Sequence, residues 1–197
     1  MNANELEERI LTAVAKSLDL DVSEVGLDTG LLGELEAESL DLLEISFRLE
    51  RDFNIALPRV NLLQHAEEVF GPGTLIDQGQ LTDLGLRVLA AMRPEVEAGQ
   101  FKPGLTWREV AQQVTPRNFS RMTQSLLAAK AAFIAESTRC PECGSHEFTA
   151  STTVPEMNCG ACEASVAFPS GDQLLLARLR ELHVEFVARE GERRAGD

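Results

Sequence analysis

A single serine lies among carboxylates at the start of an apolar run, LEAESLDLLEISF. Ser39 is that serine, and the acidic residues around it are Glu36, Glu38, Asp41 and Glu44. One interpretation is a helix N-cap, in which the serine oxygen accepts a hydrogen bond from a free amide of the first turn. The other is covalent modification of the serine hydroxyl. No capping box supports the first interpretation, since Leu42 stands where Glu or Gln would complete it.

Four cysteines form a second chemical pattern, in the stretches CPECG and CGACE: Cys140, Cys143, Cys159 and Cys162. Two Cys-x2-Cys pairs separated by fifteen residues are typical of a zinc site. Each pair directs two thiolates at one centre, so that four can close a tetrahedron around Zn²⁺. Gly144 and Gly160 each follow a cysteine, where a tight turn benefits from a permissive backbone. The sequence therefore predicts a structural zinc site.

Other roles for the cysteines fit less well. Two disulfides would need an oxidising compartment, and a redox-active Cys-x-x-Cys is expected once rather than as a symmetrical pair. Four sulfurs already complete the coordination, so we expect His146 at the surface and no open position for catalysis. Residues 138–170 hold one arginine and four glutamates, which argues against nucleic-acid binding.

The composition favours a helical protein with an acidic first third. Of 197 residues, 44% are hydrophobic and only 5% aromatic, so the core consists mainly of Leu, Val, Ala and Ile. The net charge is −14, and residues 1–58 account for −10 of it, with fourteen acidic and four basic side chains. Such a surface repels nucleic acid and attracts proteins with basic patches, although solubility alone would also explain it.

The N-terminal residues lack the charged, apolar and small-residue pattern of a signal peptide. No apolar run approaches the roughly 20 residues that cross a bilayer. We therefore expect a cytoplasmic protein without membrane insertion.

Hydrophobic periodicity places the serine at the start of the second of several helices. Residues 4–18 form one amphipathic helix, and 39–53 a second with Leu42, Ile45, Leu49 and Phe53 inside and Leu43 and Phe47 widening that stripe. Further helices are expected near 60–70, 81–92, 105–114, 119–136 and 172–190, with Thr106 and Glu109 as a capping box. GPGTLIDQG reads as a loop, and HEFTAST and EASVAF as short strands of a zinc ribbon.

The stretch LLGELEAESLDLLEISFRLERDFNIALP resembles the acyl carrier protein family. In that family a loop ending in Asp-Ser-Leu opens the second helix of a four-helix bundle, and the serine carries 4'-phosphopantetheine derived from coenzyme A. The resemblance implies that Ser39 is the attachment site, followed by Leu40. The preceding helix and the long loop occur in the family's order, and LTWREVAQQV resembles its last helix. The resemblance covers about residues 1–115.

The resemblance also implies partners and a region that contacts them. They are a phosphopantetheinyl transferase and acyl-loading or acyl-processing enzymes of the ketosynthase or acyltransferase type. The residues expected to contact them are Glu36, Glu38, Leu40, Asp41 and Glu44. Acidic side chains of this kind would dock weakly and rapidly on basic patches.

Two departures from the family pattern set this chain apart. Glu38 replaces the usual aspartate before the serine, which places the carboxylate one methylene further out. The connection between Pro58 and Gly104 is long, as in some specialised bacterial carriers, which argues against a housekeeping carrier of fatty acid synthesis. Carriers of aminoacyl groups more often have Gly-Gly-x-Ser before the helix, so the sequence favours acyl cargo.

The expected fold is mainly α: a carrier-like four-helix bundle with an extended connection, a small β zinc ribbon and a C-terminal helix. The expected boundaries are 1–118 for the bundle, 119–138 for a connecting helix, 139–170 for the ribbon, 171–190 for the C-terminal helix and 191–197 for a loose tail. The expected function is a non-catalytic acyl carrier in a specialised lipid or natural-product pathway, with the ribbon binding a partner or packing on the bundle. The alternative is an unmodified, carrier-like adaptor that acts through its ribbon.

Overall fold

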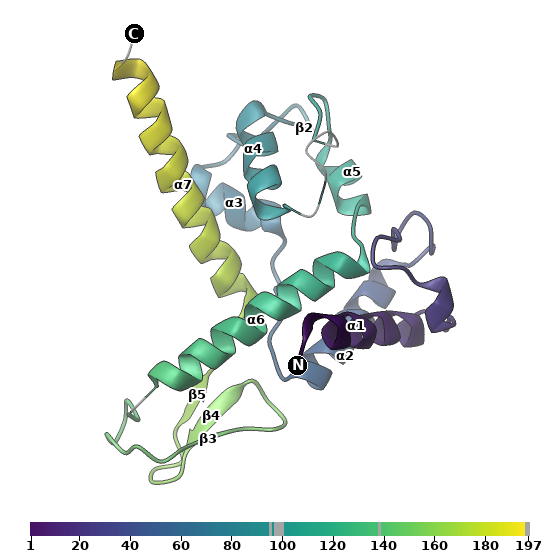
Figure 1. Cartoon of the computed structure of the whole chain (residues 1–197). Helices are drawn as coiled ribbons and strands as arrows, with labels where there is room; N and C mark the ends of the chain where they lie inside the picture. Colours follow the sequence, from purple (N-terminus) through teal and green to yellow (C-terminus); the bar gives the residue numbers. More distant parts are fainter. Residues whose placement is uncertain (95, 97–100, 138, 196–197) are drawn as a thin grey trace. The chain divides into compact units, whose positions relative to one another are not determined.

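The structure, a computed structural model, describes residues 1–94, 96, 101–137 and 139–195. It divides into two compact units, and each unit combines two separate stretches of chain (Figure 1). Unit 1 contains Met1–Leu57 and Val114–Gly171, and unit 2 contains Pro58–Gln113 and the chain from Asp172 onwards. The expected mainly helical fold with a small β module is confirmed. The domain boundaries expected from the sequence remain a prediction.

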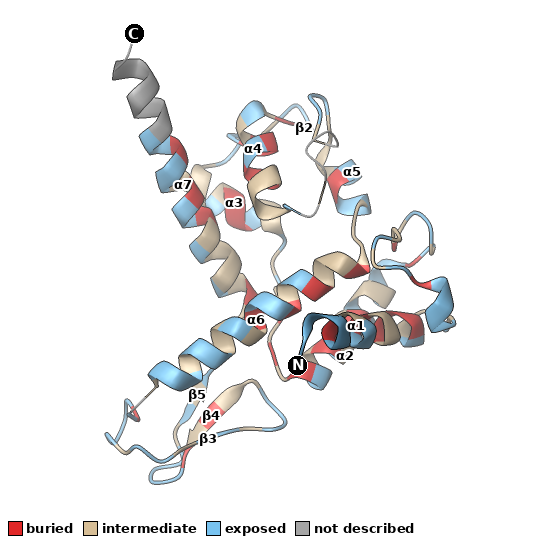
Figure 2. Cartoon of the chain, viewed as in Figure 1, coloured by how far each residue is buried: buried red, intermediate tan, exposed pale blue. Residues whose placement is uncertain are grey.

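Three helices form the helical part of unit 1: α1 (Ala3–Ser17), α2 (Ser39–Phe53) and α6 (Pro116–Glu136). α1 packs against both α2 and α6, and α2 also contacts α6. The apolar stripes predicted from the sequence meet in this core, where Ile10, Ile45 and Leu49 are fully buried. The buried residues of α6 lie in its N-terminal half, between Pro116 and Leu126, and its C-terminal half is mostly exposed (Figure 2). The N-terminal half of α6 thus completes a three-helix core with α1 and α2.

The loop from α1 to α2 is attached to the start of α6. It contains a short 3-10 helix, η1 (Val22–Glu24). The amide of Leu31 donates to the carbonyl of Val114 at 2.9 Å, and the amide of Arg117 donates to the carbonyl of Leu27 at 2.8 Å. Leu31 is fully buried. These contacts fix the segment that leads into α2.

The ribbon of unit 1 is a three-stranded antiparallel sheet with the order β3 (Phe148–Ala150), β4 (Glu156–Cys159) and β5 (Ser165–Ala167). β3 and β5 confirm the two strands expected from alternation, whereas β4, in the stretch EMNC, was not predicted. In the register, Phe148 pairs with Cys159 and Met157 with Val166. Because paired residues point to the same face, Met157, Cys159, Phe148 and Val166 share the apolar face of the sheet.

Unit 2 contains α3 (Leu62–Phe70), the hairpin β1 (Ile76–Asp77) and β2 (Gln80–Leu81), α4 (Asp83–Met92), α5 (Trp107–Gln112) and α7 (Gly171–Ala195). The hairpin lies where a loop was expected, because two-residue strands are too short to show alternation. Thr106 and Glu109 form the predicted capping box of α5. α5, which was expected to be the last carrier helix, lies in unit 2.

The core of unit 2 has two apolar clusters. One joins α3, α4 and α7 through Ala66, Val88, Leu179, Leu182 and Phe186, and the other surrounds Leu89 and Val110. Gly85 of α4 allows a close approach, because a Cβ there would lie 2.2 Å from the carbonyl oxygen of Leu75. α7 ends at Ala195 rather than near residue 190, since Gly191 weakens a helix by only about 1 kcal/mol and no proline follows it. Residues 196 and 197 of the expected tail lie outside the described residues.

None of the helices, as far as the described residues extend, combines the length and the apolar character needed to span a bilayer.

Candidate functional site: an exposed serine and a four-cysteine cluster

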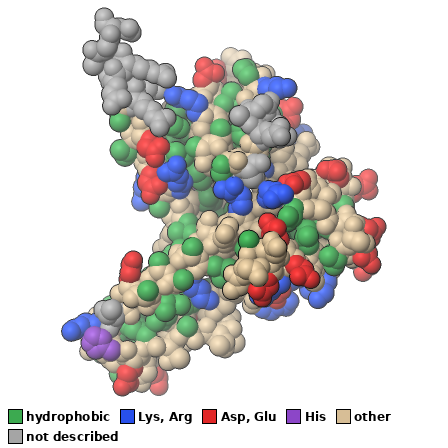
Figure 3. All heavy atoms as spheres, in the orientation of Figure 1, with side chains coloured by type: hydrophobic (Ala, Val, Ile, Leu, Met, Phe, Trp, Pro, Cys, Tyr) green, Lys and Arg blue, Asp and Glu red, His purple; other side chains and the backbone are tan. Residues whose placement is uncertain are grey.

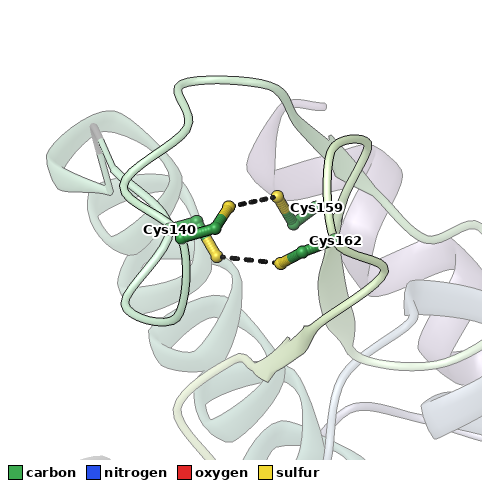
Figure 4. Close-up of side chains that lie close together, drawn as sticks. Cys140, Cys159 and Cys162 are labelled. Atoms are coloured by element: carbon green, nitrogen blue, oxygen red, sulfur yellow. Dashed lines mark hydrogen bonds between the residues drawn. The ribbon is translucent and has the colours of Figure 1, made fainter.

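The predicted metal ligands come together at one end of the ribbon. The Sγ atoms of Cys140 and Cys162 are 3.7 Å apart, and those of Cys143 and Cys159 are also 3.7 Å apart (Figure 4). All four sulfurs lie within 4.8 Å of one another. Zn–S bonds of about 2.3 Å would place the sulfurs of a tetrahedron about 3.8 Å apart. The four thiols therefore match the size of a closed zinc site.

Each cysteine pair forms the same tight turn. The amide of Gly144 donates to the carbonyl of Cys140, and the amide of Glu163 donates to the carbonyl of Cys159, both at 2.9 Å. The residue after the second cysteine of each pair is left-handed, with φ of 75° at Gly144 and 61° at Glu163. Glycine was expected to serve this purpose in both turns. In the second turn, however, the left-handed position falls on Glu163 rather than Gly160.

The thiols strongly perturb one another. Hydrogen bonds from the amides of Ala161 and Cys162 lower the pKa of Cys159 to about 7. The amide of Ala164 acts in the same direction on Cys162, but hydrogen bonds with the other thiols and burial outweigh it and raise that pKa to about 12. Neighbouring thiols in this cluster therefore oppose one another's ionisation. A divalent cation bound between them would remove this opposition, because its charge stabilises several adjacent thiolates at once.

Ser39 is the first residue of α2 and is exposed to solvent. Glu38, with non-helical backbone angles, is the N-cap, and its amide donates to Asp41 Oδ2 at 2.8 Å. The N-cap interpretation of Ser39 is therefore wrong, because the cap lies one residue earlier. Within the part of the chain that the structure describes, the Ser39 hydroxyl has no hydrogen-bond partner. It lies at the positive end of the helix dipole, which favours an anion there.

The loop before Ser39 is held by contacts that are distant in sequence. Arg117 of α6 forms a two-pronged ion pair with Asp28, with 2.6 Å between Nη2 and Oδ2. The guanidinium lowers the pKa of Asp28 below its usual value. The amide of Ala37 donates to the carbonyl of Leu31 at 2.9 Å, and both side chains are buried. This anchoring fixes the position of Ser39 while leaving it exposed.

The residues predicted to contact partners surround this serine. Glu36, Glu38, Leu40 and Glu44 are exposed and Asp41 is half-buried. Leu40 exposes 73% of its surface, which is unusual for a leucine and leaves it available for contact. Glu44 pairs with Arg48 at 2.7 Å. Figure 3 shows acidic side chains gathered over α1 and the loop that follows it.

Comparison with known proteins identifies this part of the chain. Residues 8–67 match the family model described as "Phosphopantetheine attachment site". The acyl carrier protein of Guillardia theta is 36% identical over 58 residues, which are 29% of this chain and 72% of that protein. The acyl carrier protein of Porphyromonas gingivalis is 30% identical over 74 residues, 38% of this chain and 90% of that protein. The chain belongs to the acyl carrier protein family.

Another similar protein is named for a polyketide synthase. The polyketide-8 synthase acyl carrier protein 2 of Streptomyces avermitilis is 39% identical over 56 residues, 28% of this chain and 64% of that protein. No solved structure matches the chain. The family model ends at residue 67, before the first of the four cysteines, so the cysteine cluster has to be interpreted from its own geometry.

The carrier helix α2 is less covered than its sequence suggested. Leu43 and Phe47 were expected to widen the buried stripe, but they expose 49% and 56% of their surface. That expectation is wrong, because α1 and α6 cover only the side of α2 that carries Ile45, Leu49 and Phe53. The carrier therefore presents an apolar strip of Leu40, Leu43 and Phe47 directly after Ser39.

One polar pair of the carrier was missed entirely. Nε2 of His65 and Oδ1 of Asp172 are 2.9 Å apart within unit 2, and His65 is buried. Partial burial alone would raise the pKa of Asp172, but hydrogen bonds from His65 and from the amides of Arg59 and Val60 lower it below its usual value. The 107 residues between the partners left no local pattern from which to predict this contact.

Proposed function

We propose that this protein carries acyl thioesters on a 4'-phosphopantetheine arm attached to Ser39. One observation carries the proposal. An exposed hydroxyl, which has no hydrogen-bond partner among the described residues, opens the second helix of a chain whose residues 8–67 match the phosphopantetheine attachment model. The protein acts as a carrier and does not itself catalyse a reaction. The thiol for thioester formation comes from the arm, so the protein's own cysteines remain available for a metal.

In the attachment step the Ser39 hydroxyl is the group of this chain that reacts. The hydroxyl oxygen attacks the phosphorus of coenzyme A that bears the pantetheine, and the nucleotide half of coenzyme A leaves. A transferase accepts the hydroxyl proton and supplies the metal. The resulting phosphodiester carries a negative charge beside the N-terminus of α2, where the helix dipole stabilises an anion.

Partner enzymes would recognise the surface around the arm. Glu36, Glu38, Asp41 and Glu44 provide negative charge, and Leu40 provides an exposed apolar contact in their midst. Charge complementarity of this kind raises association rates more than affinity, which suits a carrier that visits several enzymes. We propose acyl-loading and acyl-processing enzymes as these partners, in a specialised lipid or natural-product pathway.

The cysteine cluster would hold a structural zinc ion. Cys140, Cys143, Cys159 and Cys162 offer four sulfurs at the spacing of a tetrahedral site, and amides of the two turns donate to them. A site closed by four sulfurs leaves no position for substrate, so the metal would serve folding rather than catalysis.

Mass spectrometry tests the carrier function directly. The protein is incubated with coenzyme A and a broad-specificity phosphopantetheinyl transferase, and its intact mass is measured. We expect wild type to gain one phosphopantetheinyl group and Ser39→Ala to gain none. Ser23→Ala, which removes another exposed hydroxyl from the same unit, is the matched control and should be modified like wild type.

A failure of modification would favour the second candidate, an unmodified adaptor that acts through its ribbon. This candidate is favoured by Glu38, because its carboxylate lies further from the backbone than that of the family's aspartate. Glu38→Asp separates the two causes. If the wild type is not modified and Glu38→Asp is, the side-chain length is responsible; if neither is modified, the carrier function is refuted.

A further inference from the structure

The C-terminal end of α2 is held by three other elements of unit 1. Arg9 of α1 donates to the carbonyl of Asp52 at 2.9 Å, and its guanidinium lies 4.2 Å from the centre of the Phe53 ring. Lys130 of α6 donates to the carbonyl of Asn54 at 3.0 Å. The side-chain amide of Asn54 donates to the carbonyl of Ser151 in the ribbon at 2.7 Å. The two cations also complement the negative end of the helix dipole.

Asn54 is the residue at which these contacts meet. It ends α2 in a left-handed conformation, with φ of 50°, and thereby directs its side chain away from the helix. Its backbone accepts from α6 and its side chain donates to the ribbon. The segment just after Asn54 is also attached to the end of the ribbon. The amide of Gly171, directly after the ribbon, donates to the carbonyl of Ala56 at 2.7 Å.

The ribbon contributes a second contact through Phe168, which follows β5 and is buried. The ring of Phe168 meets the ring of Phe133 edge-on at 6.0 Å and lies 4.9 Å from the ammonium nitrogen of Lys130. The amide of Phe168 donates to the carbonyl of Pro155, in the turn between β3 and β4. The same turn begins with Ser151, so both ribbon contacts depend on one end of the sheet.

The cysteines lie at the other end of that sheet. Cys159 pairs with Phe148, and only two strand residues separate Phe148 from Ser151. The sheet is small, with three strands of three or four residues. The buried apolar side chains among the described ribbon residues are few: Cys140, Met157, Cys159 and Phe168. Small modules with so little core generally fold only when they bind their metal.

We infer that metal binding by the four cysteines stabilises the C-terminal turn of α2, through the contacts of Ser151 and Phe168 with Asn54 and Lys130. The ribbon is therefore a metal-dependent brace on the helix that begins at Ser39. The metal supply would set how firmly this helix is held, although the metal lies in a separate module. The inference rests on the proposed zinc site but not on modification of Ser39.

Hydrogen exchange of the full chain tests this coupling. Zinc-loaded and chelator-treated proteins are compared by mass spectrometry, following the amides of residues 50–57 and of the ribbon. Free zinc at 100 times its dissociation constant suppresses opening of the bound module about 100-fold. We expect exchange of residues 50–57 to slow by about tenfold or more along with the ribbon. Protection of the ribbon without any change at residues 50–57 would overturn the inference.

Two variants test the route of the coupling. Asn54→Gly tolerates the left-handed conformation but removes the amide that donates to Ser151. It should reduce the zinc-dependent slowing at residues 50–57 by about two- to tenfold, the equivalent of one hydrogen bond. Lys130→Met keeps the aliphatic chain near Phe168 and should act in the same direction. Asp19→Gly is the matched control, because Asp19 follows α1 with φ of 54° and is exposed; it should leave the slowing unchanged.

The outcomes separate this inference from the proposed zinc site. Native mass spectrometry establishes whether one zinc ion is bound. If the wild type binds no zinc, both the zinc site and the brace are refuted, while modification of Ser39 is unaffected. If zinc binds and both Asn54→Gly and Lys130→Met keep the full response of residues 50–57, only the brace is refuted.

Discussion

The Ser39 end of α2 and the cysteine cluster differ in how much of a functional site the chain itself supplies. At Ser39 the chain provides one exposed hydroxyl, and in the proposed attachment the coenzyme A, the base and the metal would come from outside. At the cluster it provides four sulfurs within 4.8 Å, which leave no room for an outside reagent. The proposed attachment requires that the Ser39 hydroxyl be exposed to solvent, whereas metal binding requires that the four sulfurs enclose the ion. We therefore expect the two sites to respond to different substitutions.

Loss of one metal ligand should have the largest effect. Cys159→Ser removes a buried sulfur from the closed set, and structural zinc contributes an apparent 10–16 kcal/mol, roughly, to small zinc modules. We expect the variant to lose stoichiometric zinc and the hydrogen-exchange protection of β3, β4 and β5. Ser165→Ala, on the polar face of the same sheet, is the control. Zinc retained by Cys159→Ser at wild-type stoichiometry would contradict a four-sulfur site.

A substitution in the core should have the second-largest effect on stability. It should also distinguish the buried face of α2 from its exposed face. Leu49 is fully buried, and truncation of such a leucine costs about 2–5 kcal/mol. We expect Leu49→Ala to lower the free energy of unfolding by that amount in urea denaturation. Leu40→Ala on the exposed face should stay within about 0.5 kcal/mol of wild type. Similar losses for both variants would mean that Leu40 is covered in solution.

The anchor of the loop before Ser39 should give a small, pH-dependent effect. Arg117 lowers the pKa of Asp28 below the unfolded value of 3.8, so the folded state favours the carboxylate. The resulting stability is fully present above pH 3.8 and is lost as the pH falls through the lower folded value. Since Asp28 is 73% exposed, we expect at most about 1 kcal/mol.

Urea denaturation across the acidic range measures this contribution. Asp28→Asn should lower the stability near neutral pH and flatten the acid limb of the profile, and Asp19→Asn serves as the exposed control. A wild-type profile that matches Asp28→Asn throughout would show that the ion pair contributes nothing.

The smallest expected effect is an increase in the stability of the ribbon, from a substitution at the cysteine cluster. Glu163 holds a left-handed backbone at the position that glycine occupies in the other turn. Glu163→Gly should raise the stability of the zinc-loaded ribbon by up to about 1 kcal/mol, measured as a higher thermal midpoint. Gly144→Ala imposes the opposite change and should lower it. If both substitutions shift the midpoint in the same direction, the backbone explanation fails.

The local features of both sites could be predicted because they depend on residues close together in sequence. The bounds of α2, Ser39–Phe53, follow from its apolar spacing, and the capping box of Thr106 and Glu109 follows from their separation by three. The cysteines could be grouped because each pair forms one turn. The N-cap at Glu38 was missed because two adjacent polar residues can each serve as a cap, and only the backbone angles decide between them.

Features that join distant segments could not be predicted in this way. The burial of Leu43 and Phe47 was overestimated because periodicity identifies a stripe but not how much of it a neighbour covers. Nothing in the sequence paired His65 with Asp172 or Asn54 with Ser151.

The sequence by itself determined which residues could do chemistry here: one serine among acids at a helix start, and two cysteine pairs at the spacing of a zinc site. Residue type and short-range spacing suffice to identify these residues, because the members of one turn, or of adjacent turns of a helix, lie within a few positions of one another in the sequence. Only the tertiary structure decided that the Ser39 hydroxyl is exposed and that the ribbon contacts the opposite end of the same helix. Those outcomes depend on how segments 76 to 97 residues apart pack together, which no local pattern records.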